Sequence, residues 1–245
     1  MRSELVSSIG FAGLAFRFLA VTAAQPDLAD NDPPKVTITA PADNGEFQWN
    51  SLVPYAISVS DREDGKTEFE EIAANEVLLR IAFLPNPSRK DKYLLDLSKA
   101  DNQPLQRMSV SNCFTCHAAK TKLIGPSFDL IAKRYPDTPE TVESLAKKVI
   151  TGATGTWGNV QMPPHPDLKI DQATEMVAWI LRNSSDPDQS FVVGIEGAFR
   201  TREKPDNDAG TGIYVLTASY MDHGLKDIPQ SRKQGQHTIM LKPSR

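Results

Sequence analysis

Short segments in which apolar and polar residues alternate fill the first third of the chain. Alternation with a period of two is typical of β-strands that bury one face. The sequence Val36-Thr37-Ile38-Thr39, for example, puts two aliphatic side chains on one face and two hydroxyls on the other. The pattern predicts an all-β sandwich in residues 25–94, with strands at Val36–Ala40, Glu46–Asn50, Val53–Ser60 and Glu76–Phe83.

Apolar residues recur at helical spacing in residues 95–183, which we predict to form an all-α domain. A first helix is expected between Asp101 and Asn112. A second follows Pro126, and a third begins behind Thr138 as its cap and ends at Gly152. The last helix is expected to begin with Asp171 as its cap.

Residues 184–245 predict a linker and a short β-extension. Strands are expected at Phe191–Val193, Gly212–Tyr220 and Thr238–Lys242. Three strands are too few for an independent sandwich, so the segment either packs on the helical domain or completes the sheet of the first β-domain. The predicted fold is therefore multi-domain.

The charge is modest and unevenly distributed. The chain has 245 residues, 40% of them hydrophobic, and a net charge of −4, which argues against a nucleic-acid partner. From Gln25 to Lys92, 13 acidic residues face 7 basic ones, whereas from Cys113 to Asn183 the count is 7 to 8. The two regions are therefore expected to have different tasks.

Residues 1–24 resemble a secretory signal peptide. Arg2 precedes an apolar run from Leu5 to Phe16, and small residues up to Ala24 suit cleavage there. The run is short for a bilayer span, so no stable membrane anchor is expected. An amphipathic N-terminal helix is the alternative.

Both cysteines of the chain lie in one motif, Cys113-Phe114-Thr115-Cys116-His117. This spacing is the attachment signature of a c-type haem, in which the thiols add to the vinyl groups and the histidine ligates the iron. A structural zinc site needs about four Cys or His ligands, and here only His165 could join the motif. A redox dithiol of the thioredoxin type needs a βαβ setting, which the helical pattern does not offer.

A sixth iron ligand is usually a methionine sulfur in electron-transfer cytochromes. Met162 lies in Gln161-Met162-Pro163-Pro164, where the prolines stiffen the backbone that would present the sulfur. The alternatives are Met108, Met176 and His165. The two methionines lie on apolar helix faces, where burial already explains them.

This part of the chain resembles the small bacterial class I cytochromes c, which hold one haem by His and Met. The matching motifs are Cys113–His117, Gly125-Pro126, Gly155-Thr156-Trp157-Gly158, Met162-Pro163-Pro164 and Trp179 in the last helix. The first helix departs from the family, because its usual glycine and aromatic residue are not evident.

The resemblance assigns a role to each matching position. It implies that Cys113 and Cys116 carry one covalent haem c and that His117 and Met162 are the axial ligands. It further implies that the Pro126 carbonyl accepts a hydrogen bond from His117 and that Trp157 lies beside a haem propionate.

The first β-domain resembles bacterial immunoglobulin-like domains of the polycystic-kidney-disease type, through Ile38-Thr39-Ala40-Pro41 and Val59–Gly65. Asp30, Asp32, Asp61, Glu63 and Asp64 supply carboxylates that could bind calcium. A turn stabilised by the Asp side chains is the interpretation we favour.

Gly212–Tyr220 is similar to a segment that follows the cytochrome in secreted bacterial proteins that fuse it to a quinone-dependent sugar dehydrogenase. We therefore expect a periplasmic or secreted bacterial electron carrier and not an enzyme. Its donor would be a quinoprotein sugar or alcohol dehydrogenase, and its acceptor a cytochrome or oxidase. The alternatives are a carbohydrate- or protein-binding module with an accessory cytochrome, and a one-haem peroxidase with an open iron site.

Overall fold

The computed structural model describes residues 31–100, 102–204, 211–226, 228 and 231–244. The expected signal peptide and Asp30 lie outside the described residues. Within the described ranges, no helix is long and apolar enough to cross a membrane.

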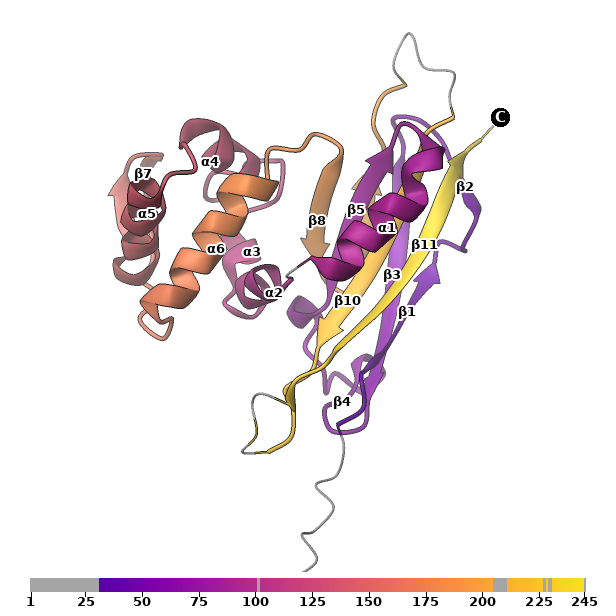
Figure 1. The fold of residues 1–245 in the computed structure, drawn as a ribbon, viewed down its shortest axis with the longest axis horizontal. Coiled ribbons are helices and arrows are strands. Elements are labelled where there is room, and N and C mark those ends of the chain that lie inside the picture. Colours follow the sequence, from indigo (N-terminus) through magenta and orange to yellow (C-terminus); the bar gives the residue numbers. More distant parts are fainter. Residues whose placement is uncertain (1–30, 101, 205–210, 227, 229–230, 245) are drawn as a thin grey trace, which may run out of the picture. The chain divides into compact units, whose positions relative to one another are not determined.

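Two β-sheets form a sandwich (Figure 1). In the first, β3 pairs with β1, β4 and β9; the second has the order β2-β11-β10-β5-β8. The strands are β1 (Lys35–Ala40), β2 (Gly45–Phe47), β3 (Leu52–Asp61), β4 (Gly65–Lys66), β5 (Leu78–Leu84), β8 (Gln189–Val193), β9 (Glu196–Arg200), β10 (Ile213–Met221) and β11 (Gln234–Pro243).

The C-terminal strands are integral to both sheets. Strand β10 pairs antiparallel with β5, Leu216 opposite Ile81, and β9 pairs antiparallel with β3, Val53 opposite Phe199. Of the two placements that the sequence left open, the structure therefore shows the completion of the first β-domain. The helical segment is therefore inserted between strands β5 and β8 of one sandwich.

The core of the sandwich is formed jointly by the strands before and after the helical segment. Val59, Leu79, Leu216 and Leu241 are all fully buried in one hydrophobic cluster that joins both sheets. Strand β10 is buried along nearly its whole length, as expected for a central strand. The N-terminal strands alone would leave much of this apolar surface in water.

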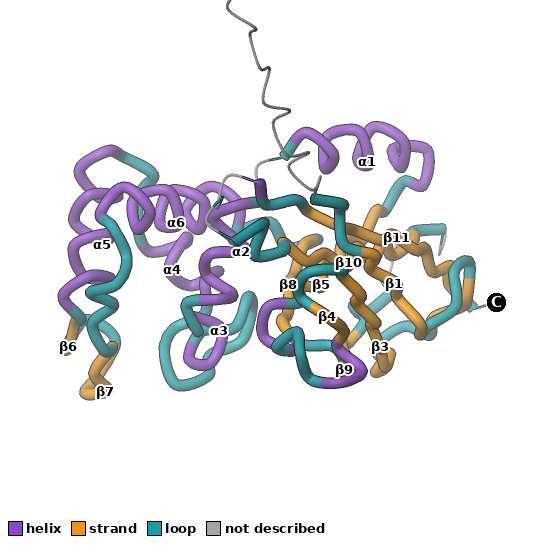
Figure 2. The backbone as a smooth tube through the Cα atoms, turned by 90° about the horizontal axis from the view of Figure 1, so that it is seen from below, coloured by secondary structure: helices purple, strands orange, loops and turns teal. Residues whose placement is uncertain are grey.

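The four predicted helices are all present between β5 and β8, and the structure adds α1, after Pro87, and the single turn α3. Figure 2 shows α4, α5 and α6 grouped together. The helices are α1 (Lys90–Lys99), α2 (Gln103–Val110), α3 (Cys113–Cys116), α4 (Phe128–Arg134), α5 (Pro139–Thr151) and α6 (Ile170–Asn183), and the 3-10 turns are η1 (Thr67–Phe69), η2 (Ala74–Glu76) and η3 (Pro87–Arg89).

Local capping chemistry accounts for several of these boundaries. The Thr138 side chain accepts a hydrogen bond from the backbone N–H of Thr141 at 3.3 Å, and Gly152 ends α5 with φ +79°. The expected cap of the last helix, Asp171, is wrong. Helix α6 is capped by Lys169, whose backbone N–H donates to the Gln172 side chain at 3.0 Å.

The inserted segment is not purely helical, contrary to the all-α expectation. Strands β6 (Ala153–Gly155) and β7 (Gly158–Met162) pair as an antiparallel hairpin after α5. Gly155 and Gly158 have φ of +93° and +116°, which the reversal between the strands requires. Because three of the seven residues from Gly152 to Gly158 are glycines, the pattern of apolar residues did not indicate this hairpin.

Candidate functional site

Helix α3 is a single turn that carries both cysteines. The backbone N–H of His117 donates to the carbonyl of Cys113 at 2.9 Å, so the turn brings His117 round directly after Cys116. Asn112, between α2 and this turn, has a left-handed conformation with φ 59°, so the chain changes direction there. The motif therefore presents two thiols and an imidazole on one tight reversal of the chain.

The loop after His117 returns to the ring and orients it. Nδ1 of His117 lies 2.7 Å from the carbonyl oxygen of Pro126, so Nδ1 is the protonated nitrogen and donates to that oxygen. Nε2 has no hydrogen-bond partner in the described part of the chain and keeps its lone pair for a metal. The ring also stacks on Phe128, with centroids 5.5 Å apart and an interplanar angle of 23°.

Gly125 is the residue that permits this approach. A side chain there would place its Cβ 2.5 Å from Cε1 of His117, closer than non-bonded carbon atoms come. The backbone N–H of Gly125 also donates to the carbonyl of Cys116 at 2.9 Å and closes the loop. The Gly125-Pro126 pair is evident in the sequence, but the contact of Gly125 with the His117 ring is visible only in three dimensions.

A large apolar cavity opens beside the motif. Its empty volume, open mouth included, is about 1210 Å³. The six residues that the sequence analysis selected all line it: Cys113, Cys116, His117, Pro126, Trp157 and Met162. Residues from helices α2, α4, α5 and α6 complete the wall, among them Met108, Ile131, Val149 and Ile180.

Met162 reaches the cavity from the end of β7. Its backbone is held close to α5: a Cβ on Gly152 would lie 2.8 Å from the Met162 carbonyl oxygen. Met108 and Met176 also line the cavity, but they are 1% and 2% exposed and belong to the hydrophobic cluster of α2 and α6. His165 does not line it.

Burial shifts the pKa of the His117 imidazole and of the Cys113 thiol. It lowers the pKa of His117, against the opposing effect of the Pro126 hydrogen bond, and so favours the neutral, metal-binding imidazole. Burial also raises the pKa of the Cys113 thiol to about 11. Before any covalent bond forms, that sulfur is therefore uncharged in its apolar setting.

Trp157 marks the rim of the cavity. Its ring is 38% exposed and lies beneath the Arg134 guanidinium, 4.5 Å from the ring centroid. Arg134 also donates to the carbonyl of Thr156 at 3.2 Å. Lys148 of α5 lines the cavity too, so the rim offers positive charge.

The residues present fit a covalently bound haem. Two thiols, one oriented imidazole with a free nitrogen, and a cavity with mostly apolar walls are grouped together. Among the described residues, no group of three or more His, Cys, Asp or Glu side chains is placed to hold a metal ion. The zinc interpretation therefore gains no support from the described residues.

Fold and site together define a haem-binding, c-type electron-transfer domain. The family model described as Cytochrome c matches residues 106–184. The chain belongs to the cytochrome c family through this segment, and its cofactor is haem c. Members of the family are electron-transfer proteins and not enzymes.

Individual relatives agree with this assignment. Cytochrome c-552 of Nitrosomonas europaea is 37% identical over 71 residues, which are 29% of this chain and 69% of the relative. Cytochrome c-551 of Azotobacter vinelandii is 36% identical over 28% of this chain and 83% of its own length. The crystal structure of Nitrosomonas europaea cytochrome c552 is 35% identical and covers 31% of this chain and 93% of that one, with a TM-score of 0.30.

One aromatic side chain from outside the matched segment packs against Phe128, which lines the cavity. Phe191 of β8 contacts Phe114, Phe128 and Trp179, with ring centroids 5.8, 6.1 and 5.3 Å away. Phe191 therefore supplies an aromatic side chain to this cluster from strand β8. No local signal in the sequence identifies Phe191, because it lies 74 residues beyond His117 in a strand pattern.

Proposed function

We propose that the chain is an exported bacterial electron carrier with one haem c bound through Cys113 and Cys116 and ligated by His117 and Met162. The observation that carries the proposal is the single cavity lined by all four residues. The bound haem supplies reversible one-electron chemistry at its iron. No substrate has to react on this chain.

On the proximal side, the chain fixes the imidazole. The Pro126 carbonyl holds the proton on Nδ1, so Nε2 is the nitrogen available to the iron. Stacking on Phe128 resists rotation of the ring. A ligand held in this way changes little between the two oxidation states, which favours rapid electron transfer.

On the distal side, the hairpin β6–β7 supports Met162 as the ligand. The close approach of Gly152 to the Met162 carbonyl ties that hairpin to the end of α5. Met108 and Met176 are already part of the packed core, and His165 is absent from the cavity wall. A thioether ligand in apolar surroundings favours a comparatively high reduction potential.

The rim is suited to the haem's carboxylates. Trp157 offers an indole N–H, and Arg134 and Lys148 offer positive charge near it. With the propionates at the rim, the apolar interior of the cavity would hold the porphyrin ring. We assign the propionate contact to Trp157, as the family resemblance implies.

The sandwich is proposed to be an immunoglobulin-like domain that carries the cytochrome as an insertion between β5 and β8. In support, β1, β3 and β9 form one sheet, while β11, β10, β5 and β8 form the other, with β2 joined parallel to β11. Tyr214 near the start of β10 accepts a hydrogen bond from the Arg202 backbone N–H at 2.7 Å. A tyrosine bonded to upstream backbone at this strand is typical of such sandwiches.

The pathway is proposed from the motif that resembles secreted dehydrogenase fusions. The donor would be a periplasmic quinoprotein sugar or alcohol dehydrogenase, and the acceptor a downstream cytochrome or an oxidase. The N-terminal segment that resembles a signal peptide supports export from the cytoplasm. In bacteria, haem is attached to this motif outside the cytoplasm.

The test is a haem stain on a denaturing gel with an absorption spectrum of protein exported from a host with cytochrome c maturation. We expect haem that survives denaturation and a weak ferric absorption band of sulfur ligation. Met162→Ala should remove that band and retain the covalent haem. Met108→Leu, Met176→Leu and His165→Ala are the matched controls and should keep it.

Three outcomes would contradict the proposal. Loss of all haem on denaturation would reject covalent attachment at Cys113 and Cys116. Persistence of the sulfur band in Met162→Ala, with its loss in Met108→Leu or Met176→Leu, would move the ligand to a core methionine. Rapid binding of carbon monoxide to the reduced protein would show an open iron site and favour a peroxidase.

A further inference from the structure

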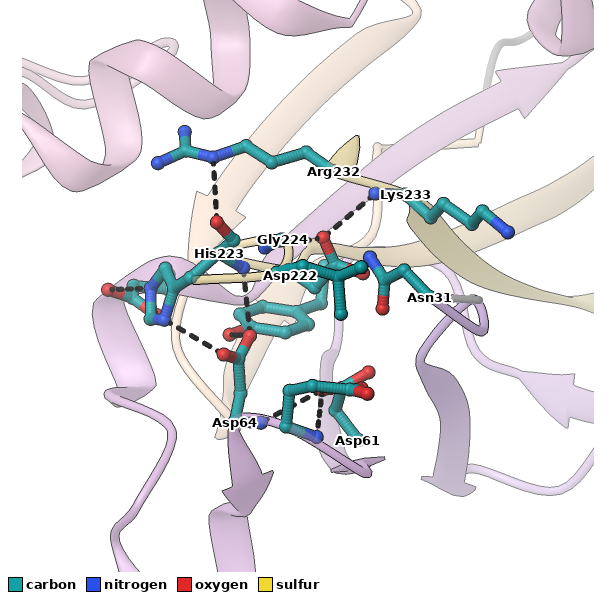
Figure 3. Close-up of polar contacts among 12 residues, drawn as sticks. Asn31, Asp61, Asp64, Asp222, His223, Gly224, Arg232 and Lys233 are labelled. Atoms are coloured by element: carbon teal, nitrogen blue, oxygen red, sulfur yellow. Dashed lines mark hydrogen bonds and ion pairs between the residues drawn. The ribbon is translucent and has the colours of Figure 1, made fainter. Parts of the chain in front are cut away.

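Two groups of polar side chains join parts of the chain that are distant in sequence. The first lies within the sandwich (Figure 3), where Asn31 donates to Asp222 at 2.8 Å and a ring nitrogen of His223 lies 3.1 Å from Asp64. The second centres on Lys120, in the loop that follows the cysteine motif. It joins this loop to the linker that leads back into the sandwich, and it therefore bears on the haem site.

The ammonium group of Lys120 lies at the C-terminal end of helix α6. Nζ donates to the carbonyl of Ser184 at 2.8 Å and to the carbonyl of Asp186. Ser184 is the residue that caps α6. Carbonyl groups at this end of a helix lack partners within the helix and carry partial negative charge, so a cation is favoured there. Lys120 supplies that cation from a different part of the chain.

The linker after α6 is also fastened to the sandwich. The backbone N–H of Phe83 in β5 donates to the carbonyl of Asp188 at 2.8 Å. Gln189, the first residue of β8, accepts a hydrogen bond from Arg80 of β5 at 3.2 Å and donates one to the Asp186 carboxylate at 2.8 Å. The linker is therefore held by the sandwich at one end and by the lysine ammonium group at the other.

The loop that carries Lys120 is also the loop that orients His117. The backbone N–H groups of Phe128 and Asp129 donate to the carbonyls of the two alanines directly after His117, at 3.0 and 3.1 Å. These bonds hold the start of the loop against α4, whose Phe128 stacks on the His117 ring. Only two residues separate Lys120 from His117 in the sequence, so a movement of this loop displaces the imidazole.

Asp129 approaches the ammonium group from the side of α4. Its side chain is 11% exposed, with Oδ1 3.7 Å from Nζ of Lys120 and Oδ2 2.8 Å from Nζ of Lys133. Burial lowers the pKa of Lys120, and the Asp129 carboxylate opposes that shift. Removal of the ammonium would leave the Ser184 carbonyl and a nearly buried carboxylate with fewer partners, which is costly.

Lys122 provides a contrast two residues further along the same loop. Its side chain is exposed and forms no hydrogen bond or ion pair with any described residue. In the sequence the two lysines look alike. The tertiary structure distinguishes them, because it brings the end of α6 to one and not to the other.

We propose that Lys120 is a positioning residue for the proximal haem ligand, because it fastens the loop after His117 to the linker between α6 and β8. The inference rests on the proposed function, in which His117 is an axial ligand. The orientation and hydrogen bonding of that imidazole tune the iron, so Lys120 acts on the haem through His117. The family model ends at residue 184. Asp186 and β8 lie beyond it, so the sandwich takes part in holding the ligand.

Hydrogen exchange on the reduced, haem-loaded protein tests the attachment of the loop. Lys120→Met keeps an apolar stem and removes the ammonium group. We expect the amides of Phe128 and Asp129 to exchange at least about tenfold faster, because the loop that accepts their bonds is released. The amide of Ala146, in the middle of α5, should exchange as in the unmodified protein. Lys120→Gln, which keeps one donor group, is the second variant if Lys120→Met does not fold.

The reduction potential and the ring-proton resonances of His117 report on the ligand itself. Both should shift in Lys120→Met, and Lys120→Arg should restore them because it keeps the charge and the donors. Lys122→Met removes the same charge from the same loop and is the matched control. It should leave the exchange rates and the His117 resonances unchanged and shift the potential less.

The outcomes separate this inference from the proposed function. If the unmodified protein retains no haem on denaturation, the proposed function fails and the inference fails with it. If haem is attached but Lys120→Met leaves the Phe128 and Asp129 exchange rates and the His117 resonances unchanged, the inference alone is overturned. Equal shifts of the potential in Lys120→Met and Lys122→Met would also overturn it, because charge would then explain the effect.

Discussion

The ring of Phe191 packs edge-on against the ring of Trp179, with centroids 5.3 Å apart and an interplanar angle of 71°. Phe191 belongs to strand β8 of the sandwich and Trp179 to helix α6 of the cytochrome segment. Leu78 of β5 joins the same hydrophobic cluster as Leu105 and Met176 of the helices. The sandwich and the haem-binding helices therefore share a core.

Phe191→Ala should lower the free energy of unfolding by about 3 to 5 kcal/mol, because Phe191 is 3% exposed and its removal leaves a cavity among the rings of Phe114, Phe128 and Trp179. Denaturant unfolding followed by both haem absorbance and far-ultraviolet circular dichroism measures the effect. The two probes should shift together, since the core is shared. Phe69→Ala, at a ring that is 62% exposed, is the control and should change stability little. A loss confined to one probe would contradict the shared core.

Gly125→Ala should impair the proximal ligand. The new Cβ would lie 2.5 Å from the His117 ring, so the ring or the loop must move and the Nδ1 bond to Pro126 must lengthen. We expect a lower yield of haem-loaded protein and a reduction potential altered from that of the unmodified chain. Leu123→Ala, in the same loop at a side chain that is 50% exposed, should leave both unchanged. An unaltered potential in Gly125→Ala would show that the ring tolerates the displacement.

Gly152→Ala should disturb the proposed distal ligand. Its φ of +79° disfavours a side chain, and the Cβ would lie 2.8 Å from the Met162 carbonyl oxygen. We expect weakening of the ferric sulfur-ligation band. Gly155→Ala is the matched control, because φ there is +93° but nothing lies within 4 Å of the added Cβ. Both variants carry backbone strain, so only a difference between their spectra supports the contact with Met162.

The protein should lose stability in alkaline solution through its buried tyrosines. Burial raises the pKa of Tyr220 above its ordinary value of 10.0, and the hydrogen bond to Asp64 raises it further. Because the folded pKa exceeds the unfolded one, this stabilisation is complete below about pH 10 and decreases as the pH rises beyond it. Unfolding free energies measured between pH 8 and about pH 11 should show the decline, and Tyr220→Phe should reduce its slope.

Tyr93→Phe is the counterpart of that variant. Burial also raises the pKa of Tyr93, so its removal should likewise reduce the alkaline slope. At neutral pH the two variants should differ. Tyr220→Phe takes a donor from the Asp64 carboxylate and should cost about 1 to 3 kcal/mol. The Tyr93 hydroxyl is buried and has no hydrogen-bond partner among the described residues, so its removal should be neutral or stabilising. Equal costs at neutral pH would contradict this assignment of hydrogen bonds.

Sequence alone determined what depends on neighbouring residues. The motif from Cys113 to His117 identified the cofactor, because its chemistry requires three side chains at fixed short spacing. The cap at Thr138 and the stop at Gly152 set the bounds of α5, because both act through local backbone groups. The alternation in Val36–Ala40 located a strand, because that strand buries one face.

Tertiary structure decided what depends on residues far apart in the chain. The pairing of β5 with β10, the contact of Phe191 with Phe128 and the hydrogen bond of Asn31 to Asp222 all join distant segments. Periodicity records which face of an element is apolar and not which partner covers it. Which strands become neighbours depends on burying the apolar faces of all the strands at once. That arrangement exists only in the folded chain.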